Sequence, residues 1–463
     1  MLVAGIDSST QSTKIVLCRA DDGQIVAQQN APHPDGTETD PQCWWEALAS
    51  AGAGLLERAD AIGIAAQQHG MVVLDETGRV IRPALLWNDL RSASAAAELI
   101  EELGGPSWWA SRTGSVPTAS FTVTKLRWLA SHEPSAAVRV TRVLLPHDWL
   151  TWRLGGASGM PATDRGDASG TGYFSPATSE WLPSVAATAL GRPVELPTVA
   201  APGSIVGHTA GGVPLSAGTG DNMGAALGLG VAPGEVVVSI GTSGTAYAVT
   251  SVPAADETGA VAGFCDATGR FLPLVATVNA ARVLGACARM LGVDVAEFDA
   301  LALGAPAGAG GLTLLPYLDG ERTPNRPTAT GVLRGITSTN ATPSNMARAA
   351  VEAVLCSLAD ALGCLVSCGV PVTSVLLIGG AARSAAVRAI APAVFGVPVT
   401  VPSPAEYVAL GAARQAAWAL SGLASPPEWP RPGGLLYEGV ADHTVLARYA
   451  SLRDATATWA TGE

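Results

Sequence analysis

The chain has 463 residues, of which 48% are hydrophobic and 14% charged, so a globular protein with two or three domains is expected. The formal net charge of −12 argues against a nucleic-acid or acidic-membrane partner, which would require a basic face. The N-terminal "MLVAGIDSST" lacks the features of a signal peptide, and the seven cysteines include no CxxC pair. These properties predict a cytoplasmic protein without a membrane-bound part.

Short β-rich runs alternate with Ala-rich helical stretches along the chain, which is typical of an α/β fold. Residues 2–7 and 14–20 read as two apolar strands that flank the polar turn "SSTQST". A helix is expected from Asp40, a suitable N-cap that is followed by Pro at the first helical position. Residues 61–70, "AIGIAAQQHG", read as a strand that ends in polar residues.

The second half of the chain repeats part of this scheme. Residues 235–250, "EVVVSIGTSGTAYAVT", again read as strand, polar turn and strand. Residues 372–396 predict a strand, a Gly-rich turn and a helix, and residues 406–420 predict a further Ala-rich helix. The apolar residues 351–370 contain two carboxylates and therefore predict a core helix rather than a membrane span. A duplicated architecture follows, with domains 1–228 and 229–463 and a cleft between them.

The two Ser/Thr/Gly turns are candidate phosphate sites, because they expose backbone N–H groups and hydroxyls with little side-chain bulk. Asp7 ends the strand before the first turn, and a carboxylate beside phosphates is sensible only with a cation such as Mg²⁺ between them. Ordinary polar hairpins are the alternative for both turns. Lys14, which starts the next strand, is either a solvated side chain or a phosphate contact.

Asp221 stands in the apolar run "LSAGTGDNMGAALGLG", where an unpaired carboxylate would be costly to bury. The surrounding glycines would let a substrate atom approach, so Asp221 is a candidate general base for phosphoryl transfer. Its alternative role is the N-cap of the following helix. The turn "IGGAARS", residues 378–384, is either a nucleotide contact or tight helix–sheet packing. Asp164 and Asp167 are expected to cap a turn.

Several motifs taken together resemble those of one family. "GIDSSTQSTK", "QQHG", "WNDLR", "LLPHDWL", "AGTGDNMGAALGLG", "SIGTSG", "LLPYLDGERTP" and "GGAARS" occur in the order found in the FGGY carbohydrate kinases. Within that family they are most similar to the motifs of enzymes that phosphorylate D-xylulose. The resemblance implies a two-domain actin-like (ribonuclease H-like) ATPase fold that closes over ATP and a sugar. It also implies phosphorylation of D-xylulose to D-xylulose 5-phosphate with Mg-ATP.

The resemblance assigns roles to particular residues. Asp221 corresponds to the general base, and Asp7 and Asp221 would lie near Mg²⁺. Sugar contacts would come from Gln68, His69, Asp221 and Asn222, with Trp87, Asn88 and Asp89 close by. ATP contacts would come from Ser9, Thr10, Gly241, Thr242, Ser243, Gly379, Gly380 and Arg383. Glu321 and Arg322 in "GERTP" are given a structural role, and His69 has the alternative of an ordinary polar residue at a strand end.

The chain departs from the family pattern at one position of the sugar pocket. Enzymes for D-xylulose typically have Met-His-Gly where this chain has Gln68, His69 and Gly70. An amide adds a donor and an acceptor beside the substrate, which keeps other acceptors open: ribulose, a tetritol, gluconate or glycerol. A catalytically weak sugar sensor on the same fold is a further alternative. Homodimers are common for such folds, and a homodimer is one alternative for the oligomeric state.

Overall fold

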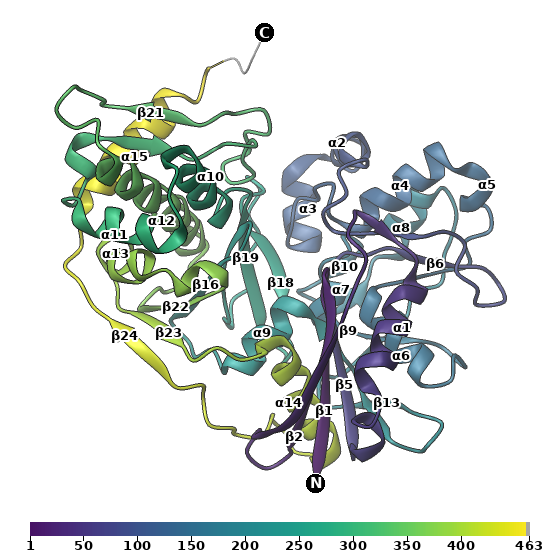
Figure 1. Ribbon diagram of the computed structural model, residues 1–463. Helices are drawn as coiled ribbons and strands as arrows, with labels where there is room; N and C mark the ends of the chain where they lie inside the picture. The colour runs from purple at the N-terminus through teal and green to yellow at the C-terminus, as the bar shows by residue number, and fades with distance from the viewer. Residues whose placement is uncertain (460–463) are drawn as a thin grey trace. The chain divides into compact units, whose positions relative to one another are not determined.

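Two mixed β-sheets organise the chain in a computed structural model that describes residues 1–459 (Figure 1). The first unit comprises Met1–Val231, Thr250–Pro273 and Ala405–Arg431, and the second comprises Ala232–Val249, Leu274–Pro404 and the chain from Pro432 onwards. The units are therefore not two continuous halves of the chain. The sequence-based boundary after residue 228 stays a prediction.

The first unit contains these strands: β1 (Leu2–Ser8), β2 (Ser12–Arg19), β3 (Ile25–Pro32), β4 (Glu38–Thr39), β5 (Ala61–Ala66), β6 (Val72–Leu74), β7 (Ala84–Leu85), β8 (Arg142–Leu144), β9 (Ala162–Asp164), β10 (Phe174–Ser175), β11 (Glu180–Trp181), β12 (Thr198–Ala200), β13 (Ile205–His208), β14 (Pro214–Ser216), β15 (Thr219–Gly220) and β18 (Ala262–Cys265). Its helices are α1 (Pro41–Gly52), η1 (Leu56–Arg58), α2 (Ala93–Glu102), α3 (Gly105–Thr113), α4 (Thr122–His132), α5 (Pro134–Ala137), α6 (Pro146–Leu154), α7 (Arg165–Ala168), α8 (Pro183–Leu190), α9 (Asp221–Leu229) and α14 (Tyr407–Ser421).

The second unit contains β16 (Glu235–Ile240), β17 (Gly244–Ala248), the end of β19 (Phe271–Thr277), β20 (Thr313–Leu315), β21 (Val332–Arg334), β22 (Ser374–Ile378), β23 (Val399–Pro402) and β24 (Gly434–Tyr437). Its helices are α10 (Ala281–Leu291), α11 (Val295–Gly304), η2 (Ala309–Gly311), α12 (Pro343–Ser367), η3 (Gly380–Arg383), α13 (Ala385–Phe395) and α15 (His443–Ala455).

The two sheets share a core topology, which confirms the repeat seen in the sequence. In the first sheet, β1 and β2 form an antiparallel hairpin, and β5 runs parallel to β1 on its other side. In the second sheet, β16 and β17 form the antiparallel hairpin, and β22 runs parallel to β16. In each sheet the polar turn of the hairpin therefore lies at the same edge as the carboxyl end of the parallel strand.

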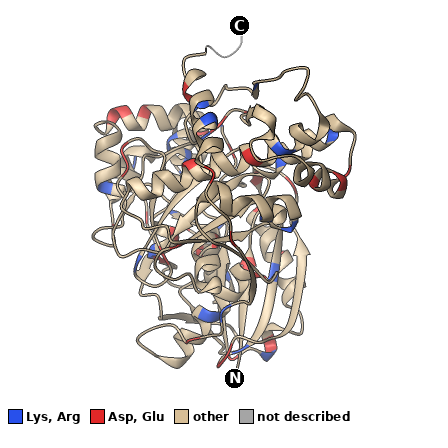
Figure 2. Ribbon diagram, turned by 90° about the vertical axis from the view of Figure 1, so that its left-hand side faces the viewer, with Lys and Arg blue, Asp and Glu red and all other residues tan. Residues whose placement is uncertain are grey.

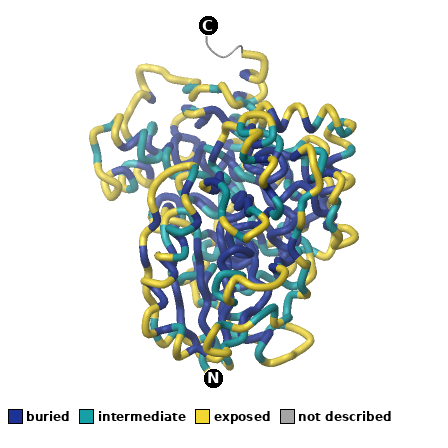
Figure 3. The backbone as a smooth tube through the Cα atoms, turned by 90° about the vertical axis from the view of Figure 1, so that its right-hand side faces the viewer, coloured by how far each residue is buried: buried dark blue, intermediate teal, exposed yellow. Residues whose placement is uncertain are grey.

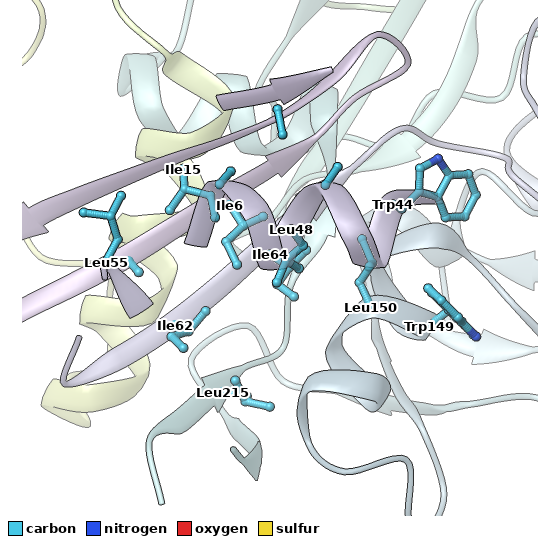
Figure 4. Close-up of a cluster of buried hydrophobic side chains, with 14 of the residues drawn as sticks. Ile6, Ile15, Trp44, Leu48, Leu55, Ile62, Ile64, Trp149, Leu150 and Leu215 are labelled. Carbon is cyan, nitrogen blue, oxygen red and sulfur yellow. The ribbon is translucent and has the colours of Figure 1, made fainter. Parts of the chain in front are cut away.

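The central strands β1, β2 and β5 of the first sheet are largely buried on both faces, whereas β3 and β13 are partly exposed. Figure 3 shows the buried stretches of the chain in dark blue. One face packs on α1 and α6 through a cluster drawn in Figure 4, which includes Ile6 of β1, Ile15 of β2, Ile64 of β5, Leu48 of α1 and Trp149 of α6. Charged residues are concentrated on helices and loops (Figure 2), and β5 has none. Alternation along each strand explains the two buried faces, because successive side chains point in opposite directions.

The other face of this sheet is covered by α14, which packs directly on the backbone of β1 and β5. A Cβ added to Gly5 would lie 1.9 Å from the carbonyl oxygen of Ala409, and one added to Gly63 would lie 2.2 Å from that of Ala412. Gly5 and Gly63 are register partners on neighbouring strands, so they form one flat patch beneath the helix. Larger residues at either position would push α14 away from the sheet.

Several local predictions are confirmed, but several helices were not predicted. Asp40 accepts a hydrogen bond from the backbone N–H of Gln42 (2.9 Å) and so caps α1. The apolar stretch around residue 360 forms α12, which is long and apolar enough to span a membrane, but 72% of its most apolar window is buried within the structure. The predicted core role for this helix is thus confirmed. The sequence predicted no element in the regions that form α2, α3, α4, α6, α8, α10, α11 and α15.

Candidate active site

Asp7 lies near the end of β1, opposite Lys14 of β2. Its side chain is only 3% exposed, and its carboxylate accepts a hydrogen bond from the hydroxyl of Ser9. Burial raises the pKa of Asp7 to about 6, although the nearby charge of Lys14 acts in the opposite direction. Lys14 itself forms an ion pair with Glu406 (2.7 Å), which precedes α14. The first turn therefore contains a carboxylate that is poorly neutralised by its surroundings.

The predicted residues of the first turn lie together. The indole N–H of Trp87 donates to the hydroxyl of Thr10 at 2.8 Å, which ties the "WNDLR" loop to the turn between β1 and β2. The two residues after Trp87 bind the segment that precedes β4. The side-chain amide of Asn88 donates to the carbonyl of Gly36 at 3.3 Å, and the carboxylate of Asp89 accepts from the hydroxyl of Thr37 at 2.8 Å. The N–H of Trp87 is thus used by Thr10, which leaves its partly exposed ring for other contacts.

Asp221 is the first residue of α9, and the N-cap is Gly220, so the N-cap alternative for Asp221 is wrong. Strand β5 separates it from Asp7 in the sheet, because Asp7 and Thr219 both pair with Ala65. Burial and, to a smaller extent, the negative charges of Asp7 and Asp167 together raise the pKa of Asp221 to about 7. A carboxylate with this pKa accepts a proton readily near neutral pH.

A chain of side-chain amides connects Asp221 with the end of β5. The amide nitrogen of Asn222 donates to Oδ1 of Asp221 and to Oε1 of Gln68, each at 2.9 Å. The amide nitrogen of Gln68 is buried, and in the part of the chain that the structure describes it has no hydrogen-bond partner. His69 follows, with Nδ1 at 2.6 Å from the carbonyl oxygen of Gly170. The structure thus brings together Gln68, His69, Asp221 and Asn222 of the predicted sugar site, whereas Trp87 binds Thr10 of the first turn.

The glycines around Asp221 are required by packing, and the expectation that they also let a substrate approach stays a prediction. A Cβ on Gly218 would lie 2.5 Å from the His147 ring, and one on Gly220 would lie 2.8 Å from Cγ of Gln68. Both contacts are with other parts of the first unit. Small residues at these positions therefore allow the segment before α9 to fit against its neighbours.

Sequence reasoning missed a buried charged cluster near the end of β15. Asp164 caps α7 as predicted, but Asp167 does not cap a turn: it forms an ion pair with Nδ1 of His147 at 2.6 Å. Burial opposes charge on His147, but Asp148 and Asp167 outweigh it and raise the histidine pKa to about 9. The motif "LLPHDWL" contains His147 and Asp148 but not Asp167, and its apolar neighbours were the available sign that His147 and Asp148 are buried.

The carboxylates present fit a magnesium ion that binds mainly to phosphates. Residues 1–459 contain no group of three or more His, Cys, Asp or Glu that could hold a metal ion. Asp7 and Asp221 offer two carboxylates, and both have a raised pKa because little positive charge compensates for their burial. Mg²⁺ in nucleotide sites is usually held by one or two carboxylates, waters and substrate phosphates. The donor set of this chain matches that arrangement.

In the second unit, the predicted phosphate turn lies between β16 and β17. The N–H of Gly241 donates to the carbonyl of Ser243 at 3.0 Å, and the carbonyl of Gly241 accepts from the N–H of Ala281 at the start of α10. The guanidinium of Arg282 donates to the carbonyl of Thr242 at 3.3 Å. The turn is thus held by the first residues of α10, and the Thr242 side chain is exposed.

In the Gly-rich turn after β22, Gly379 packs against a neighbouring strand, whereas Gly380 has space around it. A Cβ on Gly379 would lie 2.7 Å from the backbone of Ile240, which supports the packing alternative at this residue. Gly380 has no atom within 4 Å of its Cβ position and, like Arg383, is exposed. Residues 380–383 form η3, and α13 starts only after Ser384, whose hydroxyl accepts from the N–H of Val387. The turn therefore does not open directly into the helix.

Glu321 has the structural role that the sequence analysis gave it. Its carboxylate is 2% exposed and accepts hydrogen bonds from the backbone N–H groups of Val278 (2.6 Å), Asn279 (3.3 Å) and Arg322 (2.8 Å). Burial lowers the pKa of Arg322, while the charge of Glu321 opposes this shift.

Comparison with known proteins identifies the family. Residues 2–228 match the FGGY family of carbohydrate kinases, N-terminal domain, and residues 236–420 match the C-terminal domain of the same family. The chain is 47% identical to the xylulose kinase of Streptomyces coelicolor over 96% of this chain and 95% of that protein. It is 46% identical to the xylulose kinase of Streptomyces rubiginosus over 97% of this chain and 95% of that one.

A solved structure has the same fold. The crystal structure of xylulose kinase from Bifidobacterium adolescentis matches with a TM-score of 0.92 at 43% identity, covering 98% of this chain and 99% of that chain. The expected two-domain actin-like α/β fold is thereby confirmed. Two family matches that together extend over most of the sequence leave one conclusion: this chain belongs to the FGGY family of carbohydrate kinases.

Proposed function

We propose that this kinase transfers the γ-phosphoryl group of ATP to a hydroxyl of D-xylulose, which yields D-xylulose 5-phosphate and ADP. The observation that carries the proposal is Asp221: a carboxylate with a pKa of about 7, hydrogen-bonded to Asn222 and one strand away from Asp7. Two relatives of this chain, at 47% and 46% identity, are xylulose kinases, which supports D-xylulose as the acceptor. The reaction is assigned to the cytoplasm.

In the proposed reaction, Asp221 accepts the proton of the sugar hydroxyl as that oxygen attacks the γ-phosphorus. The bond between this phosphorus and the β–γ bridging oxygen breaks, and ADP leaves with the bond's electron pair. The hydrogen bond from Asn222 fixes one oxygen of Asp221, which keeps the carboxylate aligned. A pKa near neutrality lets the same group bind the proton and release it afterwards.

The sugar is proposed to bind Gln68, His69 and Asn222, with the ring of Trp87 close by. Gln68 has a buried amide N–H group available as a donor, since its oxygen is already occupied by Asn222. Hydrogen-bonding groups that are left unpaired without the substrate discriminate strongly in favour of a substrate that satisfies them.

The nucleotide is proposed to bind both polar turns. Ser9 and Thr10 would contact phosphate oxygens in the first unit, and Gly241, Thr242 and Ser243 would do so in the second. Gly379, Gly380 and Arg383 would contact the adenosine end. Asp7 and Asp221 would hold Mg²⁺, which when bound offsets the negative charge of the phosphates.

A second acceptor of the same class is favoured by one observation. Gln68 stands where enzymes for D-xylulose typically have Met, and its amide forms part of the hydrogen-bonded chain to Asp221. A ribulose, tetritol, gluconate or glycerol kinase would share the remaining chemistry, and a sugar sensor would bind one of these without turnover.

The deciding experiment is release of ADP from Mg-ATP with a panel of ketoses, aldoses and polyols at one protein concentration. We expect D-xylulose to have the highest kcat/KM. A higher value with another sugar would replace the acceptor but keep the mechanism. If no sugar stimulates ADP release although one of them binds in a calorimetric titration, the sensor alternative is correct.

A further inference from the structure

The backbone of His69 has an unusual conformation for the residue that the proposed function places beside the sugar. Its φ angle is +66°, in the left-handed region that residues other than glycine rarely occupy. Such a conformation is retained where surrounding contacts determine it, and these sites often serve function. The left-handed conformation of His69 is therefore expected to depend on the groups that contact its backbone.

Two side chains of α4 bind the carbonyl oxygen of His69. The ammonium of Lys125 lies 2.7 Å from this oxygen and 2.5 Å from the carbonyl oxygen of Ser120. The hydroxyl of Thr122 donates to the His69 carbonyl at 3.2 Å. Lys125 is one of only two lysines in the sequence, and it is fully buried. Burial lowers its pKa to about 7, with the charge of Asp89 acting in the opposite direction.

An ammonium group in this position is expensive, because desolvation of the charge has to be offset by its hydrogen bonds. Its partners are the backbone carbonyls of His69 and Ser120. The two hydrogen bonds from the Lys125 side-chain nitrogen are short, so they hold the His69 carbonyl in one place.

The imidazole of His69 is fixed as well. Nδ1 lies 2.6 Å from the carbonyl oxygen of Gly170, which can only accept, so Nδ1 carries the proton. In the neutral ring Nε2 is then the acceptor. The ring packs against Phe121 and Phe264, with ring centroids 4.8 Å and 5.6 Å away. A Cβ on Gly170 would lie 2.9 Å from this ring, so only glycine allows the approach.

We propose that Lys125 is a positioning residue of the acceptor-sugar site: its ammonium holds the backbone of His69 in the left-handed conformation, which presents Nε2 to a sugar hydroxyl. The inference rests on the proposed function, since it assumes that His69 contacts the sugar. Lys125 acts through His69 and does not touch the substrate.

The first test compares Lys125→Met with wild type in steady-state kinetics. We expect KM for D-xylulose to rise about ten-fold or more, because a small displacement of a substrate-binding group is costly. KM for Mg-ATP should change less than about two-fold. Equal changes in both KM values, or none, would overturn the proposal. If wild type itself has no D-xylulose kinase activity, the proposed function fails instead.

A milder pair of variants keeps the test valid if Lys125→Met does not fold. Thr122→Val removes the second hydrogen bond to the His69 carbonyl, and Thr124→Val is its matched control. Thr124 lies on the same helix and is equally buried, but its hydroxyl binds the carbonyls of Ala119 and Phe121. Only Thr122→Val should raise KM for D-xylulose. The same KM in both variants would contradict the proposal.

A double-mutant cycle tests whether Lys125 acts through His69. Glycine adopts a positive φ without strain, so His69→Gly removes the imidazole and keeps the turn. In this background Lys125→Met should change kcat/KM for D-xylulose less than about two-fold, since no side chain remains to be positioned. Full additivity of the two substitutions would show that Lys125 has only a general structural role.

Discussion

The amide nitrogen of Asn222 lies 2.9 Å from the side-chain oxygen of Gln68, although 154 positions separate the two residues in the sequence. This hydrogen bond joins the end of β5 to the start of α9. It also fixes the orientation of the Gln68 amide, since the oxygen is committed to Asn222 and the nitrogen must point elsewhere.

The Gln68–Asn222 bond can be tested by substitution with the residue that D-xylulose enzymes typically have. Gln68→Met removes the acceptor for Asn222 and the buried donor. A lost hydrogen bond of about 1 kcal/mol corresponds to about a five-fold change, so KM for the preferred sugar should rise by that factor. KM for Mg-ATP should remain constant. A fall in KM for D-xylulose, measured alongside the sugar panel, would instead show that the amide selects a different acceptor.

Asp221 is expected to be indispensable for phosphoryl transfer. Asp221→Asn keeps the shape of the side chain but removes the base, so kcat should fall by about 10²- to 10⁴-fold. Binding of ATP, measured by calorimetry without Mg²⁺, should stay close to wild type. Asp21→Asn, at an exposed position of the same unit, is the control and should have wild-type kcat. Near-normal turnover of Asp221→Asn would refute the assignment of the base.

The pH dependence of kcat/KM should report the ionisation of Asp221. Burial raises the pKa of this carboxyl to about 7, and the base is active only when deprotonated. Activity should therefore increase as the pH rises from 6 to 8 and then level off. A profile that stays flat over this range would mean that another group is the base. The measurement requires sugar concentrations well below KM, so that the free enzyme is observed.

The ion pair of His147 and Asp167 is expected to matter for both stability and catalysis. Both side chains are fully buried, so Asp167→Asn removes one of the two carboxylates that pair with His147 and leaves Asp148, 3.2 Å from Nε2, as the other. We expect a loss of unfolding free energy below the roughly 3–5 kcal/mol typical of a buried charge left with no partner. The same change removes a negative charge that raises the pKa of Asp221. In the variant protein that remains folded, the rise of kcat/KM with pH should therefore occur at lower pH than in wild type. An unchanged pH profile would show that Asp167 is too well screened to influence the base.

Much of the fold could be predicted because its signals are local. The two hairpins, the polar end of β5 and the capping of α1 by Asp40 each depend on residues that are close in sequence. The charged cluster could not be predicted, because His147 and Asp167 come from separate helices that only the tertiary structure brings together. For the same reason the packing contacts of the glycines near Asp221 were not predicted: a small residue leaves room equally for a substrate or for a neighbouring side chain.

The site residues on the sheet edges were found through motifs, but their partners were not. Nothing in the sequence shows that the Trp87 indole binds Thr10, or that Lys125 holds the His69 carbonyl. Such contacts depend on loop geometry, which local patterns do not determine.

The contact of α14 with Gly5 and Gly63 has a consequence for synthesis of the protein in the cell. The helix that covers β1 and β5 is encoded about 400 positions after β1, with most of the second unit between them. A nascent chain cannot place α14 on the first sheet until Ser421, the last residue of this helix, has left the ribosome. Until then the face of the first sheet that α14 covers stays exposed. We therefore expect chaperones that bind apolar surface to bind this chain during translation rather than after it.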